Sequence, residues 1–331
     1  MTSFALLPDP STPLSRESAR AAFADILDGR ASEQAIADFL VRLSERGETS
    51  LEIAEAARSL RERLIPIDAP PGAIDVCGTG GDGHHTLNVS TAVALVVAAA
   101  GVPVAKHGNR AASSKAGAAD TLEALGLDML RAGALAEATL RDLGVCFLFA
   151  ANHHPAMRRI QPIRQRLGRR TIFNLMGPLA NPAHVTRQLL GIARPDYTPV
   201  FAEALEQLGT EAALVVSGEE AIDEVSGAGP TVVVAVGNIS LPNHVAPEDA
   251  GLPRHPISAI CGGDAFENAA ALRRLLNGEA GAYRDAVLLN AAAALIVAGR
   301  TTDLREGAEI AAGALDGGAA ARLLDAWIAY G

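Results

Sequence analysis

The sequence contains little cysteine and no long uncharged apolar run. Its three cysteines, Cys77, Cys146 and Cys261, are scattered and match neither a zinc-binding spacing nor a disulfide framework. We therefore expect a protein of the reducing cytoplasm. The longest uncharged apolar stretch, residues 91–105, includes a glycine and a proline, whereas a membrane-spanning helix needs about 20 apolar residues. We expect no membrane span, and the first residues lack the basic and apolar regions of a signal peptide.

Positive charge is also scarce. Lysine and arginine total 28 against 38 aspartates and glutamates, which gives a formal net charge of −10. Proteins that bind nucleic acid through its phosphates are usually basic, so we do not expect nucleic acid to be the partner. Of the 331 residues, 49% are apolar, which excludes a disordered chain and suffices for two domains or one large one.

Negative charge is missing from two long stretches. Residues 83–119 contain no Asp or Glu but three basic residues, and residues 143–195 contain no acid but eight arginines. Since these stretches carry +3 and +8, the rest of the chain carries −21. Solvated arginines are one explanation, but two such gaps in an acidic protein favour a local anion-binding site.

The first part of the chain, residues 14–64, is predicted to be entirely helical. Apolar residues repeat at helical spacing in three segments, from Ala19 to Leu27, from Ile36 to Leu43 and from Ile53 to Leu64. Residues typical of N-terminal caps precede the second and third segments, and glycines follow the first two. Residues 66–72 contain three prolines and a glycine, which is typical of a linker.

After this linker, short β-rich runs alternate with helical segments. The predicted strands are residues 74–76, 102–105, 145–150, 189–193, 213–217 and 231–236. Strands separated by helices predict an α/β fold with a mainly parallel sheet flanked by helices. The helical residues before the linker predict a small all-α N-terminal domain.

A glycine-rich loop follows the first predicted strand. Residues 78–83 read GTGGDG and match G-x-G-x-x-G, the dinucleotide-binding pattern. NAD is disfavoured because the next helix is predicted to begin near Asn88, too late for that motif, and because Lys106 occupies the region of the expected ribose-binding acid. Glycines that let backbone amides approach an anion, followed by Ser90 and Thr91 at a helix start, favour a phosphate site. The alternative is an ordinary strand-to-helix turn with a capped helix.

Longer motifs extend this pattern over nearly the whole chain. They are DVCGTGGDG from Asp75, NVST from Asn88, KHGNRAASSKAGAADTLEALG from Lys106, HHPAMRRIQPIRQRLGRRTIFNLMGPLANP from His153, and the pair Asp223 and Glu224. In these motifs the sequence resembles the anthranilate phosphoribosyltransferases of tryptophan biosynthesis. The pyrimidine nucleoside phosphorylases share the fold and part of the pattern, but they lack the KHGN and GPLxNP combination.

The resemblance implies transfer of the phosphoribosyl group of phosphoribosyl pyrophosphate (PRPP) to the amine of anthranilate, with release of pyrophosphate and with Mg²⁺ as the cofactor. It also implies a small helical domain, residues 1–68, joined by helices from about residues 165–188, and an α/β phosphoribosyl-binding domain over residues 69–331. A homodimer packed through the helical part is expected. The alternatives are a nucleoside phosphorylase that uses inorganic phosphate and a non-enzymatic nucleic-acid-binding relative on the same scaffold.

The resemblance also assigns site residues. It places PRPP against Gly78, Gly81, Asp82, Thr86, Asn88, Val89, Ser90, Thr91, Lys106, His107, Gly108, Asn109, Arg110, Ala111, Ala112, Ser113, Ser114 and Ala118. It places anthranilate against Gly78, His107, Asn109, His154, Arg164, Gly177 and Pro178, with His107 and His154 as flat walls beside the ring. It places Mg²⁺ against Ser90, Asp223 and Glu224. Ala118 stands where many relatives have a serine near the phosphate, which removes one hydrogen bond to the ligand.

These residue types suit the reaction chemically. Breaking the bond between the anomeric carbon and pyrophosphate puts negative charge on the leaving group, which hydrogen-bond donors and Mg²⁺ stabilise. Mg²⁺ prefers oxygen ligands, and the guanidinium of Arg164 suits the anthranilate carboxylate. The amine of anthranilate is unprotonated at neutral pH, so no strong general base is needed. Without the resemblance, Asp223 and Glu224 fit a solvated acidic loop equally well, and Arg164 fits the protein surface better.

Overall fold

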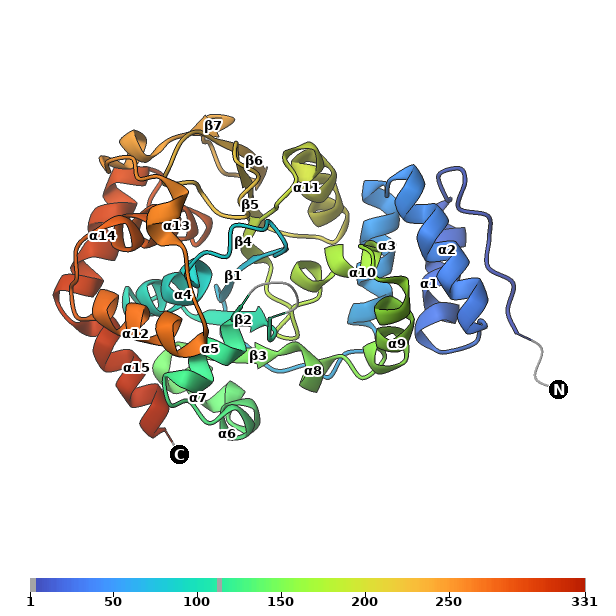
Figure 1. Cartoon of the computed structure of the whole chain (residues 1–331), viewed down its shortest axis with the longest axis horizontal. Helices are drawn as coiled ribbons and strands as arrows, with labels where there is room; N and C mark the ends of the chain where they lie inside the picture. Colours follow the sequence, from blue (N-terminus) through green and yellow to red (C-terminus); the bar gives the residue numbers. More distant parts are fainter. Residues whose placement is uncertain (1–3, 112–114, 331) are drawn as a thin grey trace.

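The structure, a computed structural model, describes residues 4–111 and 115–330. A group of helices that carries the N-terminus lies beside a larger part built around a sheet (Figure 1). Within the part of the chain that the structure describes, none of the helices combines the length and the apolar composition that crossing a membrane requires.

The N-terminal helices are α1 (Arg16–Leu27), α2 (Glu33–Arg46) and α3 (Ser50–Arg61). The hydroxyl groups of Ser15, Ser32 and Thr49 accept hydrogen bonds from backbone N–H groups of the first turns and so cap the three helices. The apolar stripes predicted from the sequence form the buried faces of these helices. The prediction of an entirely helical segment over residues 14–64 is therefore confirmed.

A later segment of the chain returns to these helices. It contains α9 (Met157–Leu167), α10 (Ile172–Leu175) and the 3-10 turn η1 (Gly177–Leu179). Ile160 of α9 and Ile172 of α10 are buried in the same core as Phe23 of α1 and Leu40 of α2. The resemblance implies a return from about residue 165, whereas α9 already begins at Met157.

Among the described residues, seven strands form one sheet in the order β3-β2-β1-β4-β5-β6-β7. They are β1 (Ile74–Gly78), β2 (Val104–Gly108), β3 (Val145–Phe149), β4 (Arg187–Gly191), β5 (Ala212–Gly218), β6 (Thr231–Gly237) and β7 (His244–Val245). The strands from β1 to β5 are parallel, and β6 and β7 run antiparallel to their neighbours at one edge. The predicted mainly parallel sheet is thus confirmed, and all six predicted strands are present.

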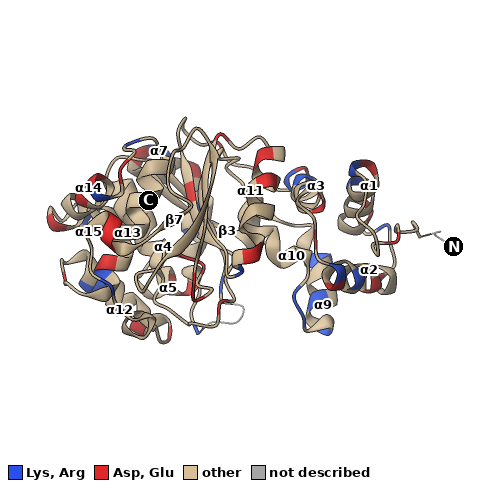
Figure 2. Ribbon diagram, turned by 90° about the horizontal axis from the view of Figure 1, so that it is seen from above, with Lys and Arg blue, Asp and Glu red and all other residues tan. Residues whose placement is uncertain are grey.

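Helices cover both faces of this sheet (Figure 2). They are α4 (Val89–Ala99), α5 (Ala118–Ala124), α6 (Met129–Ala134), α7 (Ala136–Leu143), α8 (Ala150–His153), α11 (Thr198–Gln207), α12 (Ala265–Leu276), α13 (Ala282–Val297), α14 (Leu304–Asp316) and α15 (Ala319–Ala329), with the 3-10 turns η2 (Pro195–Tyr197), η3 (Pro247–Ala250) and η4 (Ile257–Ile260). One face packs on α4, α13 and α14, and the other packs on α11 and the helical part.

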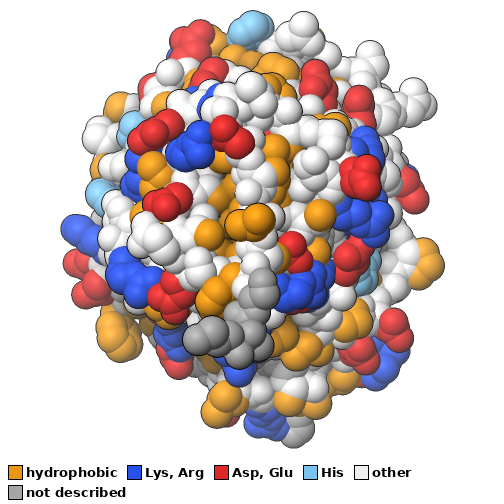
Figure 3. All heavy atoms as spheres, turned by 90° about the vertical axis from the view of Figure 1, so that its right-hand side faces the viewer, with side chains coloured by type: hydrophobic (Ala, Val, Ile, Leu, Met, Phe, Trp, Pro, Cys, Tyr) orange, Lys and Arg blue, Asp and Glu red, His pale blue; other side chains and the backbone are white. Residues whose placement is uncertain are grey.

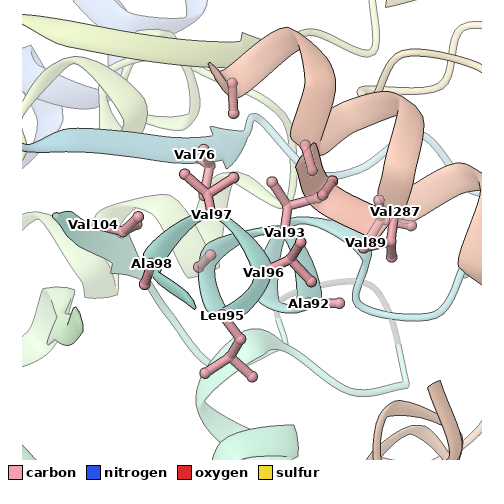
Figure 4. Packing of buried hydrophobic residues seen from close by; sticks show 14 of the residues in the cluster. Val76, Val89, Ala92, Val93, Leu95, Val96, Val97, Ala98, Val104 and Val287 are labelled. Carbon is pink, nitrogen blue, oxygen red and sulfur yellow. The ribbon is translucent and has the colours of Figure 1, made fainter. Parts of the chain in front are cut away.

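The helix α4 is buried between the sheet and α13. In Figure 4, Val97 lies beside Val76 of β1, and Val89 lies beside Val287 of α13. Burying each of these side chains contributes roughly 1.5–3 kcal/mol, and a helix that is apolar on all sides is typical of a protein core. This packing holds the first turn of α4 close to the loop that leads into it.

The order of the strands selects one place for a ligand. The strand β1 has β2 on one side and β4 on the other, so the connections that leave β1 and β4 diverge to opposite sides of the sheet. In open α/β sheets, ligands bind outside the carboxyl ends of the strands at such a switch point. The glycine-rich loop follows β1 at this edge.

Candidate active site

Two glycines at the carboxyl ends of β1 and β4 allow the chain to cross the sheet edge. Gly78 of β1 and Gly191 of β4 are paired in the sheet register. A Cβ atom on Gly78 would overlap the carboxylate of Asp223, and one on Gly191 would overlap the backbone oxygen of Asp223. These close contacts require glycine at both positions. They place Asp223 directly over the switch point, although it is more than 140 residues from Gly78 in the sequence.

The glycine-rich loop is open on one side. Gly80, Gly81 and Gly83 have φ angles of 66°, 74° and 81°, a region that side chains other than glycine rarely adopt. No described atom lies within 4 Å of where a Cβ atom would stand on Gly80 or Gly83. The backbone N–H of Gly80 donates to Oδ2 of Asp223 at 2.6 Å. Backbone groups of the loop therefore face open space beside a carboxylate, as an anion–cation site requires.

The side chain of the N-cap residue does not cap the first turn of α4. Asn88 occupies the N-cap position but makes no capping hydrogen bond. Its Oδ1 instead accepts from Oγ1 of Thr121 at 2.6 Å and from Nδ2 of Asn268 at 2.9 Å. The predicted helix start near Asn88 is confirmed. The N–H of Val89 donates to the backbone oxygen of Leu87 at 2.7 Å, so the N–H groups of the turn that suit an anion are those of the residues after it. Thr91 is buried and its hydroxyl makes no hydrogen bond to a described residue.

Lys106 lies inside β2, whereas the predicted strand ends at residue 105. Its side chain is only 3% exposed. Its Nζ donates to the backbone oxygen of Val76 at 2.7 Å and to Oγ of Ser90 at 3.0 Å. The ammonium group of Lys106, held inside the strand, therefore fixes the position of the Ser90 hydroxyl. Burial lowers the pKa of Lys106, and the negative charge of Asp75 opposes that shift.

Two adjacent carboxylates, those of Asp223 and Glu224, lie near the ammonium group of Lys106. The backbone of Ser90 favours the charged form of Glu224 and so lowers its pKa. Burial, and then the negative charge of Asp82, raise the pKa of Asp223 to about 6. Burial and the charge of Asp223 raise the pKa of Glu224 well above its ordinary value. The positive charge of the buried Lys106 lowers the pKa of Glu224 but does not offset these increases.

This donor set fits Mg²⁺. Within the described ranges, no three His, Cys, Asp or Glu side chains converge on one point as a closed metal site. Mg²⁺ usually takes only one or two carboxylates from the protein, with water and substrate phosphates as its other ligands. Asp223 and Glu224 supply such carboxylates, and Ser90 supplies a hydroxyl oxygen.

The two candidate histidines face each other. Their Nε2 atoms lie 3.2 Å apart, and the ring centroids of His107 and His154 are separated by 5.1 Å at a tilt of 57°. Nδ1 of His107 lies 3.1 Å from the backbone oxygen of Gly177. Burial lowers the pKa of His107 to about 3 and that of His154 to about 4, so both are neutral at pH 7. They are 6% and 5% exposed and so lie beneath the surface, and their role as flat walls beside the ring stays a prediction.

The other predicted anthranilate contacts lie on the helical part and in nearby loops. Arg164 of α9 is half-buried, burial lowers its pKa, and it makes no ion pair with a described carboxylate. Gly177 is exposed, with no described atom within 4 Å of an added Cβ, whereas Pro178 is buried. Asn109 is exposed, and its Oδ1 accepts from the backbone N–H of Arg110.

Several arginines of the acid-free stretches pair with carboxylates that lie just outside these stretches or in other segments. Arg110 pairs with Asp120 and Glu123, both at 2.8 Å. Other pairs are Arg166–Glu33, Arg169–Glu45, Arg187–Glu211 and Arg194–Asp196. The anion-site interpretation of the whole stretches is therefore too broad, because acids from other segments fold back onto them. The structure does not bring the guanidinium of Arg110 to the glycine loop as a free cation.

The remaining predicted PRPP residues are spread around this edge. Gly108 ends β2 against the ring of Phe147, Ala111 follows in the loop, and Ala118 opens α5. Thr86 pairs with Cys261, Val89 is buried at the start of α4, and the side chain of Asp82 accepts from the N–H of His84 at 3.1 Å. The predicted contacts Ala112, Ser113 and Ser114 lie outside the described residues.

Three residues that the sequence analysis did not select support the site. Asp75 is 0% exposed and accepts from the backbone N–H of His107 at 3.1 Å and from Nδ2 of Asn181 at 2.8 Å. The guanidinium of Arg170 donates to the backbone oxygen of Gly80 at 2.8 Å. Asp75 could have been found from the sequence, because an acidic residue inside an apolar strand is unusual. Arg170 could not, because the sequence does not distinguish it from the other seven arginines of its stretch.

Comparison with known proteins assigns both parts of the chain. Residues 70–321 match the model of the glycosyl transferase family, a/b domain, and residues 10–64 match the model of its helical bundle domain. An anthranilate phosphoribosyltransferase of Novosphingobium aromaticivorans is 66% identical over 326 residues, covering 98% of each chain.

Solved structures agree with this assignment. The crystal structure of anthranilate phosphoribosyltransferase from Thermus thermophilus is 46% identical, with a TM-score of 0.89 and 96% of each chain covered. The enzyme from Saccharomyces cerevisiae in complex with PRPP and Mg is 29% identical, with a TM-score of 0.86 over 96% of this chain and 93% of that one. The same yeast enzyme with 4-fluoroanthranilate is 28% identical, with a TM-score of 0.85 over 96% and 92% of the two chains.

Proposed function

The chain belongs to the anthranilate phosphoribosyltransferases, within the glycosyl transferase family, and we propose that the edge formed by β1, β2 and β4 holds PRPP and anthranilate for that reaction. The main support for this site is the close packing of Asp223 against two strand-end glycines. Gly78 and Gly191 let Asp223 pass directly over the glycine loop, so that anion-binding amides and cation-binding carboxylates meet at the switch point of the sheet.

Backbone groups supply most of the proposed PRPP contacts. N–H groups of the glycine loop and of the first turn of α4 stabilise phosphate oxygens. Ser90, Asp223 and Glu224 are the residues that would hold Mg²⁺, as their oxygen atoms and crowded negative charge indicate. When bound, Mg²⁺ neutralises negative charge on the departing pyrophosphate. The yeast relative seen with PRPP and Mg supports this part of the proposal.

The anthranilate contacts come from the other side of the site. Arg164 offers two N–H groups to the carboxylate, and the exposed Gly177 leaves room for the ring. The amine nitrogen attacks the anomeric carbon as the bond to pyrophosphate breaks, and the amine proton is released. His107 and His154 are too weakly basic to assist, because burial holds their pKa values near 3 and 4. Holding both substrates together is the main contribution of the protein.

Assembly and location are further parts of the proposal. A groove of about 560 Å³ runs between α2 and α9, with Ala37, Val41 and Leu167 in its lining. Hydrophobic side chains lie in the middle of the face formed by the helical part (Figure 3), which supports a homodimer packed through these helices. The three free cysteines are consistent with the cytoplasm. The division into domains near residue 68 is supported by the separate family matches on either side of it.

An assay of anthranilate fluorescence tests the proposed function. Anthranilate should disappear only when both PRPP and Mg²⁺ are present, and a chelator should stop the reaction. Thymidine with inorganic phosphate, offered in place of these substrates, should remain unchanged. Phosphorolysis of thymidine, or salt-dependent binding of single-stranded nucleic acid without any consumption of PRPP, would contradict the proposal.

The role of Arg164 gives a first quantitative prediction. Arg164→Ala should raise the KM for anthranilate about 10- to 100-fold and leave the KM for PRPP within about twofold, because a hydrogen bond to a charged group contributes about 1.5–3 kcal/mol. Arg166→Ala is the matched control, since Arg166 lies on the same helix but pairs with Glu33 at the surface. Steady-state kinetics measure both constants. An unchanged KM for anthranilate in Arg164→Ala would remove Arg164 from the substrate site.

A further inference from the structure

Arg170 connects the helical part to the glycine loop through one residue. It lies between α9 and α10, and its Nη2 donates to the backbone oxygen of Gly80 at 2.8 Å. The backbone N–H of the same Gly80 donates to Oδ2 of Asp223 at 2.6 Å. Gly80 is therefore held between an arginine from the helical part and a carboxylate of the proposed Mg²⁺ site.

The backbone around Arg170 is anchored on the helical part. Oγ of Ser44 in α2 donates to the backbone oxygen of Arg170 at 3.2 Å. The next residue, Thr171, is the N-cap of α10 and is tied to Asn174 by two hydrogen bonds of 3.1 and 2.8 Å. In Figure 1, α10 lies between the N-terminal helices and the sheet. A change in the position of the helical part is thus transmitted to the Arg170 side chain.

The charge of Arg170 is not neutralised where it lies. It makes no ion pair with a carboxylate of the described residues. The neighbouring Arg169, by contrast, pairs with Glu45 of its own helical part at 2.9 Å. The guanidinium of Arg170 also covers Gly81, where an added Cβ would meet Nη2. Its positive charge therefore adjoins the loop whose amides are proposed to bind phosphate.

Arg164 lies six residues before Arg170, on the helix that precedes this contact. The proposed carboxylate-binding arginine and the arginine that holds the glycine loop thus belong to one short segment of the helical part. Any shift of this segment that seats Arg164 on its ligand also acts on the contact between Arg170 and Gly80.

We propose that Arg170 is a positioning residue that couples the binding of the two substrates. It keeps the glycine loop in its phosphate-binding conformation when the helical part, which carries Arg164, is seated against the loop. Occupation of the anthranilate site favours that arrangement, so each substrate strengthens the binding of the other, and by linkage the factor is the same in both directions. This inference rests on the proposed function.

Calorimetry on the full-length protein tests the coupling. The dissociation constant of PRPP with Mg²⁺ is measured with and without saturating benzoate, which keeps the carboxylate and ring of anthranilate but lacks the reacting amine. In the wild type, benzoate should lower this constant about fivefold or more. In Arg170→Ala the ratio should approach one, PRPP should bind about tenfold more weakly, and benzoate alone should bind as in the wild type. Arg170→Lys should restore part of the ratio, because lysine can still donate one hydrogen bond.

Arg169→Ala is the matched control and should keep the wild-type ratio, since it removes an adjacent positive charge that does not reach the glycine loop. Hydrogen exchange of the backbone N–H groups of residues 78–83 should become faster in Arg170→Ala only. Wild-type coupling in Arg170→Ala, an equal loss in Arg169→Ala, or no coupling in the wild type would overturn the inference and leave the proposed function intact. Failure of the wild type to bind PRPP at all would instead contradict the proposed function.

Discussion

Replacing Asp223 by Asn together with Glu224 by Gln is expected to lower turnover about 100-fold or more at limiting Mg²⁺. Both substitutions keep the shape of the side chain and remove its charge. In the proposed site these carboxylates are the anionic oxygen ligands of Mg²⁺, and charge stabilisation at the leaving group contributes several kcal/mol to such reactions. The measurement is the rate of anthranilate consumption over a titration of Mg²⁺.

The same variant should lose turnover but not thermal stability. The pKa of Asp223 is raised to about 6 from an ordinary value of 3.8, so ionisation destabilises the folded state as the pH rises through this interval. At pH 7 and without Mg²⁺ the double variant should therefore unfold at the same or a higher temperature than the wild type. Adding Mg²⁺ with PRPP should raise the unfolding midpoint of the wild type and leave that of the variant nearly unchanged.

Glu219→Gln provides the control for this experiment, because Glu219 is exposed on the same loop. It should retain the wild-type rate and the wild-type response to Mg²⁺. Wild-type rates in the double variant, or an unchanged stabilisation by Mg²⁺ with PRPP, would exclude these carboxylates from the metal site.

Local signals made much of the fold predictable. The caps of α2 and α3 depend on residues within one turn of Ser32 and Thr49, so sequence spacing alone locates them. The parallel sheet follows from the alternation of strands and helices. The start of α4 is equally local, because the apolar run after Asn88 is longer than a typical strand.

The site depends on contacts that spacing does not encode. Asp223 reaches Gly78 only because β5 is placed two strands from β1 in the sheet, and the sequence suggested this only through its resemblance to a family. Arg110 belongs to an acid-free stretch, but Asp120 and Glu123 of the following helix pair with it. The position of Asp223 is decided by packing between distant segments, and the pairing of Arg110 by the fold of the loop that leads into α5.

The buried charge of Lys106 is expected to contribute to the stability of the fold. We expect Lys106→Met to lower the free energy of unfolding by about 3–5 kcal/mol, because removing a buried positive charge leaves a nearby buried carboxylate without its compensating charge. The uncompensated group is Asp75, which is 0% exposed. Burial raises its pKa, and the positive charge of Lys106 opposes that shift. Methionine preserves most of the apolar length of lysine, so loss of packing is a small contribution. Urea unfolding measures the change.

Adding Asp75→Asn to Lys106→Met should recover much of this loss, and the recovery separates a charge effect from a packing effect. Recovery should be incomplete, because Nδ2 of Asn181 donates to the Asp75 carboxylate at 2.8 Å and would face an amide in the variant, at a cost of about 1 kcal/mol. If the losses of the two single variants simply add in the double variant, Lys106 does not compensate Asp75, and its burial serves only its hydrogen bonds to Val76 and Ser90. The coupling expected here instead makes Lys106 an internal counter-charge that keeps β1 and β2 in place beneath the glycine loop.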